Sequence, residues 1–399
     1  MSLSSGNAAL LRRMMVSAFL MDAGFFLVLA AIPYRVLALG GGPVALGLAS
    51  AISSLTYIVL TRLAGRWSDT AGRFGMILWS TIAYAAFALL ASSVARLPLL
   101  LLTMPLLGVG NAFYWPTVQA AVGDLAGPGG LAREIGRFNV AWSAGKTAGY
   151  LAGGLLLATT GFRAAFLTGA GLVALAFAVL LGVGAPTPAG HRPDDATPSG
   201  ADVPEATRRA FRRMGWWANF AAYGAGGVLG YQLPKWFNAV GWHETRFGLF
   251  LAAVFLGQTV AFALLAGRVR FTWSVRRLLL PQAAAAAALA ALPLAGGYGL
   301  LLIGAPLLGA VFGVCYAASI FYSLDTVRGK GRNAGIHESL VGAGNFAVPL
   351  LGGATVRWTG SLAAPYVVAA LVMAGAMVAQ GTLARGLSRR SAPRPSAAG

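Results

Sequence analysis

Long apolar runs, separated by short polar stretches, occupy most of the 399-residue chain. An α-helix needs about 20 apolar residues to cross the hydrocarbon core of a bilayer, and most of these runs approach or exceed that length. The pattern predicts twelve spans near residues 14–34, 44–61, 75–95, 98–122, 138–159, 162–183, 214–238, 247–266, 278–295, 299–323, 336–358 and 361–383. We therefore expect an all-α membrane protein.

Composition excludes most soluble classes. The chain is 57% hydrophobic and 10% charged, whereas a soluble domain has about 25% charged residues. The single cysteine, Cys315, rules out an internal disulfide or a multi-cysteine metal site, and its apolar surroundings indicate packing. The first run follows Arg12 and Arg13 without a small-residue cleavage site, which predicts an uncleaved helix. No cofactor and no metal is expected.

The net charge of +19 is explained by topology. If the N-terminus is cytoplasmic, the outer segments carry only Arg35, Arg96, Arg163, Lys235, Arg246 and Arg357. Lys146 lies within a span, and all other basic residues then fall on the inner side. An excess of this size predicts a multi-pass protein of the cell (inner) membrane with both termini cytoplasmic. It does not indicate nucleic-acid binding.

The halves of the chain repeat at an offset of about 200 residues, which we read off corresponding motifs. Pro105 and Gly108 recur as Pro306 and Gly309, and Asp124 matches Asp325. Two halves that cross the membrane in the same orientation predict a pseudo-twofold axis along the membrane normal. Substrate is then expected between the halves, near the midplane of the bilayer. We expect bundles over residues 1–183 and 214–384, a cytoplasmic linker over 184–213 and a disordered basic tail over 385–399.

A charged stretch over 65–73 separates the second and third spans, and we expect a short loop there. Gly65, Asp69, Gly72 and Arg73 give the pattern G-x-x-x-D-x-x-G-R. Glycine allows close helix approach at Gly65 and a sharp turn at Gly72. Aspartate suits the N–H groups at a helix N-terminus, and arginine can hold a second carboxylate through paired hydrogen bonds.

This stretch resembles the signature loop of the major facilitator superfamily, whose transporters have twelve membrane helices in two six-helix bundles. The resemblance implies that Asp69 meets the start of the eleventh helix near Gly335 and that Arg73 pairs with Asp124. Such contacts would latch the halves together on the inner side and stabilise an outward-open state. The second-half copy of the loop, over 267–271, has lost the aspartate.

The fifth span is similar to the G-x-x-x-G-P-x-x-G-G motif found in antiporters of that family, with Tyr150 in place of the proline. Glycines at this spacing allow backbone-to-backbone packing, and a gating role is the alternative. The positions in the fifth and eleventh spans are Gly145, Gly149, Gly153, Gly154, Gly344, Pro349, Gly352 and Gly353. The fourth span has Met104 where drug-exporting members carry an arginine.

Few ionisable residues lie inside the spans, where each costs about 2.5–3.5 kcal/mol on insertion scales. Asp22 and Lys146 each lie nine residues beyond an inner arginine, so both are about 13 Å along their helices. This equal depth allows an ion pair, either direct or through water. The pair either holds the two helices together or forms a site for a proton or a charged substrate that switches during transport. Intramembrane charge is functional by default.

His337 and Glu338 lie just inside the eleventh span. They could form a proton relay, because histidine titrates near neutral pH, or they could cap the helix and touch the signature loop. The resemblance implies that helices one, four, seven and ten line the cavity. It thereby makes Asn111, Tyr114, Trp115, Gln119, Asn219, Tyr223, Gln232, Tyr316 and Tyr322 candidate substrate contacts.

Enzyme motifs fail on inspection. Gly145-Lys146-Thr147 echoes a P-loop but lacks its leading glycine, and His337-Glu338 lacks the second histidine of a zinc protease. We therefore predict a secondary active transporter, no enzyme, that exports a small molecule against protons. The alternatives are an uptake symporter of the same fold, or a receptor or assembly factor on that scaffold. The expected partners are the lipid bilayer, a small-molecule substrate and protons, with no nucleic acid and a monomeric state.

Overall fold

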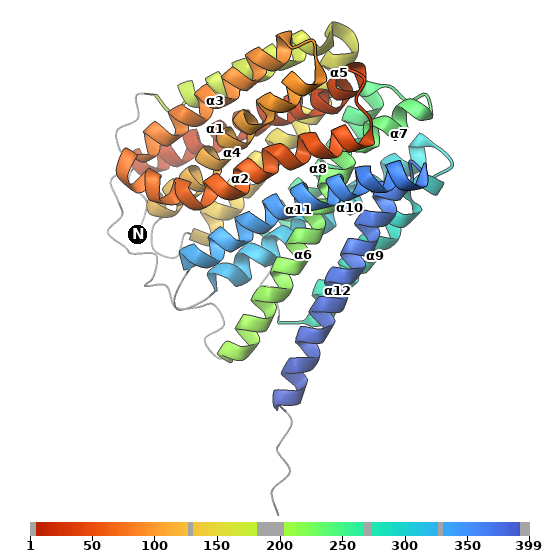
Figure 1. The fold of residues 1–399 in the computed structure, drawn as a ribbon. Coiled ribbons are helices and arrows are strands. Elements are labelled where there is room, and N and C mark those ends of the chain that lie inside the picture. The colour runs from red at the N-terminus through yellow and green to blue at the C-terminus, as the bar shows by residue number, and fades with distance from the viewer. Residues whose placement is uncertain (1–4, 127–130, 182–202, 267–272, 326–329, 392–399) are drawn as a thin grey trace, which may run out of the picture.

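The computed structural model describes residues 5–126, 131–181, 203–266, 273–325 and 330–391 (Figure 1). These residues form helices and connecting turns and no strand. The helices are α1 (Ser5–Ala38), α2 (Pro43–Ala71), α3 (Arg73–Ser93), α4 (Leu97–Leu125), α5 (Leu131–Ala178), α6 (Glu205–Tyr231), α7 (Leu233–Ala239), α8 (Glu244–Leu265), α9 (Val275–Ala291), α10 (Tyr298–Leu324), α11 (Lys330–Thr359) and α12 (Ala364–Ser391), with a 3₁₀ turn at Leu292–Leu294.

The described helices account for the twelve predicted spans. Ten of them are long and apolar enough to cross a membrane. Helix α5 contributes two spans, because Gly161 breaks it with φ of +80°, a value that favours glycine. Helix α6 is 27 residues long but less apolar, because its first turns carry arginines and its middle is rich in glycine and tryptophan. Counting both parts of α5 and adding α6 gives twelve.

The expected loop over 65–73 is wrong. Helix α2 continues to Ala71 and α3 begins at Arg73, so Gly72 alone lies between them. Residues 65–71 contain no proline and only one glycine, Gly65, and nothing in them stops a helix. The helix ends where Gly72 adopts φ of +77°, a left-handed conformation that costs glycine little. The tight turn expected at Gly72 is therefore present.

Two helix ends also lie in the segments that we expected to be a connector and a tail. Helix α6 begins at Glu205, inside the segment expected to be a connector, and α12 runs to Ser391, inside the expected tail. The first turns of α6 are held by the buried ion pair of Arg208 with Asp325, the residue that follows α10, at 3.2 Å. Burial of one charged face therefore extends this helix beyond its apolar part.

Helices α1–α5 pack on one another, and α6–α12 pack on one another, as two groups seen from red to yellow and from green to blue in Figure 1. The groups meet along two helix pairs, α2 with α11 and α5 with α8. We call the two groups the N-half and the C-half. The end of the bundle at which α4 finishes and α5 begins is called the inner end, following the predicted topology.

The sequence repeat corresponds to equivalent packing in the two halves. Gly108 of α4 lies against α2, and its counterpart Gly309 of α10 lies against α8. Gly149 of α5 lies against α1, and Gly344 of α11 lies against α6. Because a Cβ at any of these glycines would meet backbone or side-chain atoms of the partner helix, each pair of helices needs glycine to approach this closely.

Candidate functional site

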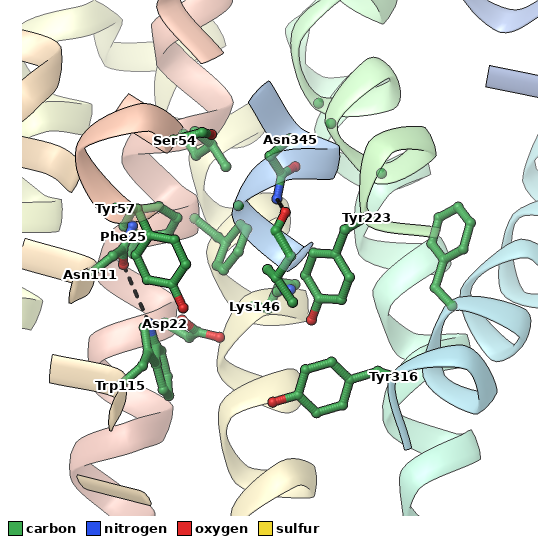
Figure 2. A pocket seen from close by; sticks show the side chains of 18 of the residues that line it. Asp22, Phe25, Ser54, Tyr57, Asn111, Trp115, Lys146, Tyr223, Tyr316 and Asn345 are labelled. Atoms are coloured by element: carbon green, nitrogen blue, oxygen red, sulfur yellow. Dashed lines mark hydrogen bonds between the residues drawn. The ribbon is translucent and has the colours of Figure 1, made fainter. Parts of the chain in front are cut away.

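A cavity of about 180 Å³ lies between the halves (Figure 2). Helices α1, α2, α4 and α5 line it from the N-half, and α6, α8, α10 and α11 from the C-half. Its charged and amide side chains are Asp22, Asn111, Gln119, Lys146, Gln258, Glu338 and Asn345. Its aromatic side chains are Phe25, Phe26, Tyr57, Trp115, Trp142, Tyr150, Tyr223, Tyr231, Phe255, Phe312 and Tyr316. The site is thus largely aromatic with a few charges, as small-molecule sites commonly are.

Backbone contacts close the cavity toward the outer end. A Cβ at Gly154 of α5 would lie 2.7 Å from the carbonyl oxygen of Glu244, and one at Gly47 of α2 would lie 2.8 Å from that of Pro349. The Gln232 amide adds hydrogen bonds to the carbonyl oxygens of Pro43, at 3.0 Å, and Pro349, at 2.9 Å. Both helix pairs that join the halves are therefore in direct contact above the cavity.

Lys146 of α5 is held by aromatic rings. Its Nζ lies 4.4 Å from the ring centroid of Phe26, 4.6 Å from Phe255, 4.9 Å from Trp142 and 5.8 Å from Tyr223. The residue is 5% exposed. Among the described residues, the ammonium group forms no hydrogen bond and no ion pair within 4.0 Å. Cation–π attraction is thus its main direct stabilisation.

Asp22 of α1 lines the same cavity as Lys146, as the equal depth along their helices predicts. Figure 2 shows its carboxylate facing the space into which Tyr223 and Tyr316 point from the C-half. Asp22 is 2% exposed. A direct ion pair between Asp22 and Lys146 is absent among the described contacts within 4.0 Å. The two charges therefore share a cavity, but no direct ion pair between them holds α1 and α5 together.

Glu338 of α11 connects the halves. Its carboxylate accepts hydrogen bonds from the Tyr57 hydroxyl, at 2.7 Å, and from the Gln119 amide, at 3.3 Å. Both donors belong to the N-half, on α2 and α4. Glu338 lies in the third turn of α11 and lines the cavity, so the expected capping role at the start of that helix is wrong.

His337 faces away from the cavity, into the C-half. Its Nδ1 shares a hydrogen bond of 2.8 Å with the Ser319 hydroxyl of α10, and the Asn219 amide donates to its carbonyl oxygen at 3.4 Å. The His337 Nε2 lies 4.0 Å from a Glu338 oxygen and has no hydrogen-bond partner among the described residues. The geometry places an imidazole beside the carboxylate without a direct hydrogen bond between them.

The nine candidate substrate contacts divide into two groups. Asn111, Trp115, Gln119, Tyr223 and Tyr316 line the cavity. The other four pack elsewhere. Tyr114 bonds to Ser17, and Asn219 bonds to His337. Gln232 is buried in the outer contact, and Tyr322 packs on Phe211 with ring centroids 5.4 Å apart.

Several cavity residues were not identified from the sequence. Tyr57 and Asn345 come from α2 and α11, and Phe26 and Phe255 come from α1 and α8. Within apolar helices an aromatic residue that faces a cavity has the same sequence environment as one that faces a neighbouring helix. The polar exception, Asn345, lies seven residues after Glu338, about two helical turns, and that spacing could have identified it.

An aromatic layer lies about one helical turn nearer the inner end than Lys146. Trp142 of α5 contacts Phe262 of α8 and Tyr316 of α10, with ring centroids 5.2 and 5.5 Å apart. Trp115 of α4 adds a contact to Trp142 at 6.2 Å. Because these rings come from both halves, movement of the halves would separate them.

The residues of the expected latch are only partly described. Arg73 and Asp124 form the ion pair that the resemblance implies, with side chains 25% and 30% exposed. Gly65 and Asp69 belong to the last turns of α2, but the surroundings of Gly65 and the side chain of Asp69 lie outside the described part of the structure, and so does any contact of Asp69 with α11. Gly335 lies in the second turn of α11, and a Cβ added to it would have no neighbouring atom within 4 Å.

The predicted packing glycines lie at helix contacts. Gly145, Gly149 and Gly153 of α5 lie against the backbone of α1, as does Gly344 of α11 against α6. Gly154, Gly352 and Gly353 face α8, the start of α12 and the start of α2, and Pro349 lies inside α11 beside Gly47. All of them lie at close helix contacts, and those of Gly154 and Gly353 join the two halves, so the gating alternative stays open there.

Comparisons with known proteins agree with this architecture. The family model described as Major Facilitator Superfamily matches residues 14–236, more than half of the chain. A search of curated proteins found no match. Among solved structures, a bacterial homolog of the human lysosomal transporter Spinster, inward-facing and occupied, has a TM-score of 0.69 at 16% identity over 98% of both chains.

Two further structures are similar. The same Spinster homolog, inward-facing and unoccupied, has a TM-score of 0.64 at 18% identity over 96% of both chains. The POT family transporter PepTSo has a TM-score of 0.71 at 15% identity over 95% of this chain and 98% of its own. At these identities the structural similarity establishes the fold. With the family match, it shows that the chain belongs to the Major Facilitator Superfamily of membrane transporters.

Proposed function

We propose that the protein is a proton-coupled secondary transporter that exports a small molecule by alternating access. The supporting observation is the cavity between the halves, in which the charged side chains of Asp22, Lys146 and Glu338 are buried. Buried charges are costly in a membrane and are typical of ion and substrate pathways. The contacts on both sides of the cavity occur between halves, so they can open and close in alternation.

Protons couple to transport through the carboxylates in this proposal. Glu338 is bound by two donors from the opposite half. A hydrogen bond to a charged carboxylate is about twice as strong as one to a neutral group. Protonation of Glu338 therefore weakens a tie between the halves, and this gives the proton a direct effect on the equilibrium between conformations.

The proposed location is the cell (inner) membrane with both termini cytoplasmic, in agreement with the distribution of basic residues. Export is the proposed direction. The direction test compares everted vesicles with whole cells that produce the protein. An exporter accumulates substrate in everted vesicles, whereas an uptake symporter accumulates it in cells.

The substrate screen uses thermal shift, because a ligand that binds the folded state raises its melting temperature. The purified protein is screened against metabolites and drugs at two pH values. A hit whose shift depends on pH and disappears in Asp22→Asn supports coupling through the cavity. A hit that is unchanged by pH and by this substitution contradicts it.

A further inference from the structure

The aromatic rings around Lys146 form a complete cation site. We call Phe26, Trp142, Tyr223 and Phe255 the aromatic cage. All four ring centroids lie within 5.8 Å of the Lys146 Nζ, in the range at which a cation is attracted by the face of an aromatic ring. Such cages are the usual recognition device for ammonium ligands. In this structure a group of the protein itself occupies the site.

The charges around the aromatic cage favour cations and disfavour anions. Ring faces carry negative electrostatic potential, and the acidic side chains of the cavity are Asp22 and Glu338. Lys146 is the one basic side chain among the described residues that line it. Without its ammonium charge the cavity would therefore present only negative potential to a ligand.

Both halves contribute to the aromatic cage. Phe26 and Trp142 belong to the N-half, and Tyr223 and Phe255 to the C-half. The Tyr150 ring stacks on Phe255 with an interplanar angle of 5° and lies 5.2 Å from Phe26, which supports two of its walls. A cation in the cage thus attracts both halves at once, and its removal releases a contact between them.

Resting on the proposed function, we propose that the substrate is a small organic ammonium ion that takes the place of the Lys146 ammonium group in the aromatic cage. A second cation in the cage would lie close to the Lys146 ammonium group and be repelled by it. Substrate therefore binds when Lys146 has given up its proton, and the proton goes to the water on the side to which the cavity is open.

Each step exchanges the charge of one substrate cation for the charge of one proton on Lys146. On the inner side a cationic substrate enters the cage, and the Lys146 ammonium becomes an amine with the release of one proton. On the outer side the substrate leaves, and the amine takes up one proton from the medium. At Lys146 each turnover thus exchanges one exported monovalent cation for one imported proton, whereas protonation of Glu338 acts separately, on the equilibrium between conformations.

Other titratable groups also face the cavity, so the proton must be assigned to Lys146 by experiment. They are Asp22 of α1, Tyr57 of α2, Tyr150 of α5, Tyr223 and Tyr231 of α6, Tyr316 of α10 and Glu338 of α11. Helices α4 and α8 contribute amide and aromatic side chains without a titratable group among the described lining residues.

The test measures binding of choline to the full chain in lipid nanodiscs by calorimetry. The control ligand is 3,3-dimethylbutan-1-ol, which has the same shape without the charge. Because one proton is displaced, choline affinity should rise by up to about tenfold per pH unit over the range in which Lys146 titrates. About one proton should be released per choline bound. This number is obtained from the binding enthalpies measured in buffers with different heats of ionisation. The neutral alcohol should not bind.

Two substitutions at position 146 give opposite results. Lys146→Met removes the competing charge, so choline should bind more tightly, and proton release should fall to near zero. Lys146→Arg keeps a charge that is not lost at accessible pH, so choline should bind at no pH. Phe255→Leu tests the cage itself and should weaken choline binding about two- to thirtyfold. Far-UV circular dichroism and gel filtration confirm folding of each variant.

The inference is overturned if Lys146→Met weakens choline binding, or if proton release persists in that variant. It is also overturned if the neutral alcohol binds with the same affinity as choline. Failure of choline to bind to both the unsubstituted protein and Lys146→Met overturns it too. Those results do not contradict the proposed function, which has a separate test. A substrate from the thermal-shift screen that moves against a pH gradient in proteoliposomes supports transport even where choline fails. Absence of any proton-coupled flux contradicts the proposed function instead.

Discussion

Tyr57 of α2 and Glu338 of α11 share a hydrogen bond of 2.7 Å across the boundary between the halves, at the wall of the central cavity. Nearer the outer end the same two helices are joined by the Ser50 hydroxyl, which donates to the Asn345 carbonyl oxygen at 2.7 Å. The outer contact uses a backbone acceptor that cannot titrate. The contact beside the cavity uses a carboxylate and is therefore sensitive to protonation.

Glu338→Gln should uncouple transport from the pH gradient. The amide oxygen can still accept from Tyr57, but it never carries the charge that strengthens this bond. We expect exchange of labelled substrate across proteoliposomes to continue, while gradient-driven accumulation falls at least about tenfold. Tyr57→Phe is the matched control, because it removes the donor and leaves the carboxylate. It should slow exchange and retain part of the coupling, because Gln119 still donates to the Glu338 carboxylate. Full accumulation in Glu338→Gln would exclude Glu338 from coupling.

Gly149→Ala should destabilise the protein, whereas Gly171→Ala in the same helix should not. A Cβ at Gly149 would lie 2.5 Å from the Ala23 carbonyl oxygen and would force α1 and α5 apart, at a cost of about 1–3 kcal/mol. Gly171 has no atom within 4 Å of such a Cβ, and alanine improves helix propensity there. Melting temperatures in detergent should fall for the first variant and hold or rise for the second. Equal melting temperatures would contradict the packing described here.

The ion pair of Arg73 with Asp124 should matter more for transport than for stability. Both side chains are partly exposed, and pairs of this kind contribute about 1 kcal/mol or less. Arg73→Asp and Asp124→Arg should each reduce the transport rate, and the exchanged pair should recover part of it. If the exchanged pair is no faster than the single variants, the contact has no role in gating.

Two neighbouring arginines of α6 should differ strongly in how much they contribute to the stability of the protein. Arg208 pairs with Asp325, and the two side chains are 6% and 2% exposed. Breaking a buried pair costs about 3–5 kcal/mol. Arg209 pairs with Glu205 at 3.6 Å with 63% of its side chain exposed, which is worth far less. Arg208→Met should therefore lower the melting temperature by many degrees, and Arg209→Met by at most a few. A similar loss in both would show that α6 does not depend on the buried pair.

Much of the fold could be predicted, because membrane insertion imposes a strong pattern. Span length, the distribution of basic residues and the repeat around Pro105 and Pro306 depend on constraints visible in a single sequence. The helical state of residues 65–71 could not be predicted in this way. A polar sequence without breakers is compatible with both a loop and an extended helix, and Gly72 decides where it ends.

The candidate site was harder to predict, because it depends on which face of each helix meets the cavity. Asp22, Lys146 and Glu338 were identified because charge is rare in an apolar helix. Phe26 and Phe255 carry no such signal. Tyr114 and Tyr223 look alike in the sequence, yet one bonds to Ser17 inside the N-half and the other reaches the cavity.

The most direct test of alternating access controlled by Glu338 is a distance measurement that needs no substrate. Spin labels at position 160, between the two parts of α5, and at position 361, between α11 and α12, occupy exposed outer positions of opposite halves. Cys315, which is buried, is first replaced by alanine. Double electron–electron resonance in nanodiscs should show two distances whose populations shift between pH 5 and pH 8, and this shift should be much smaller in Glu338→Gln. A single distance that is the same at both pH values would contradict the account.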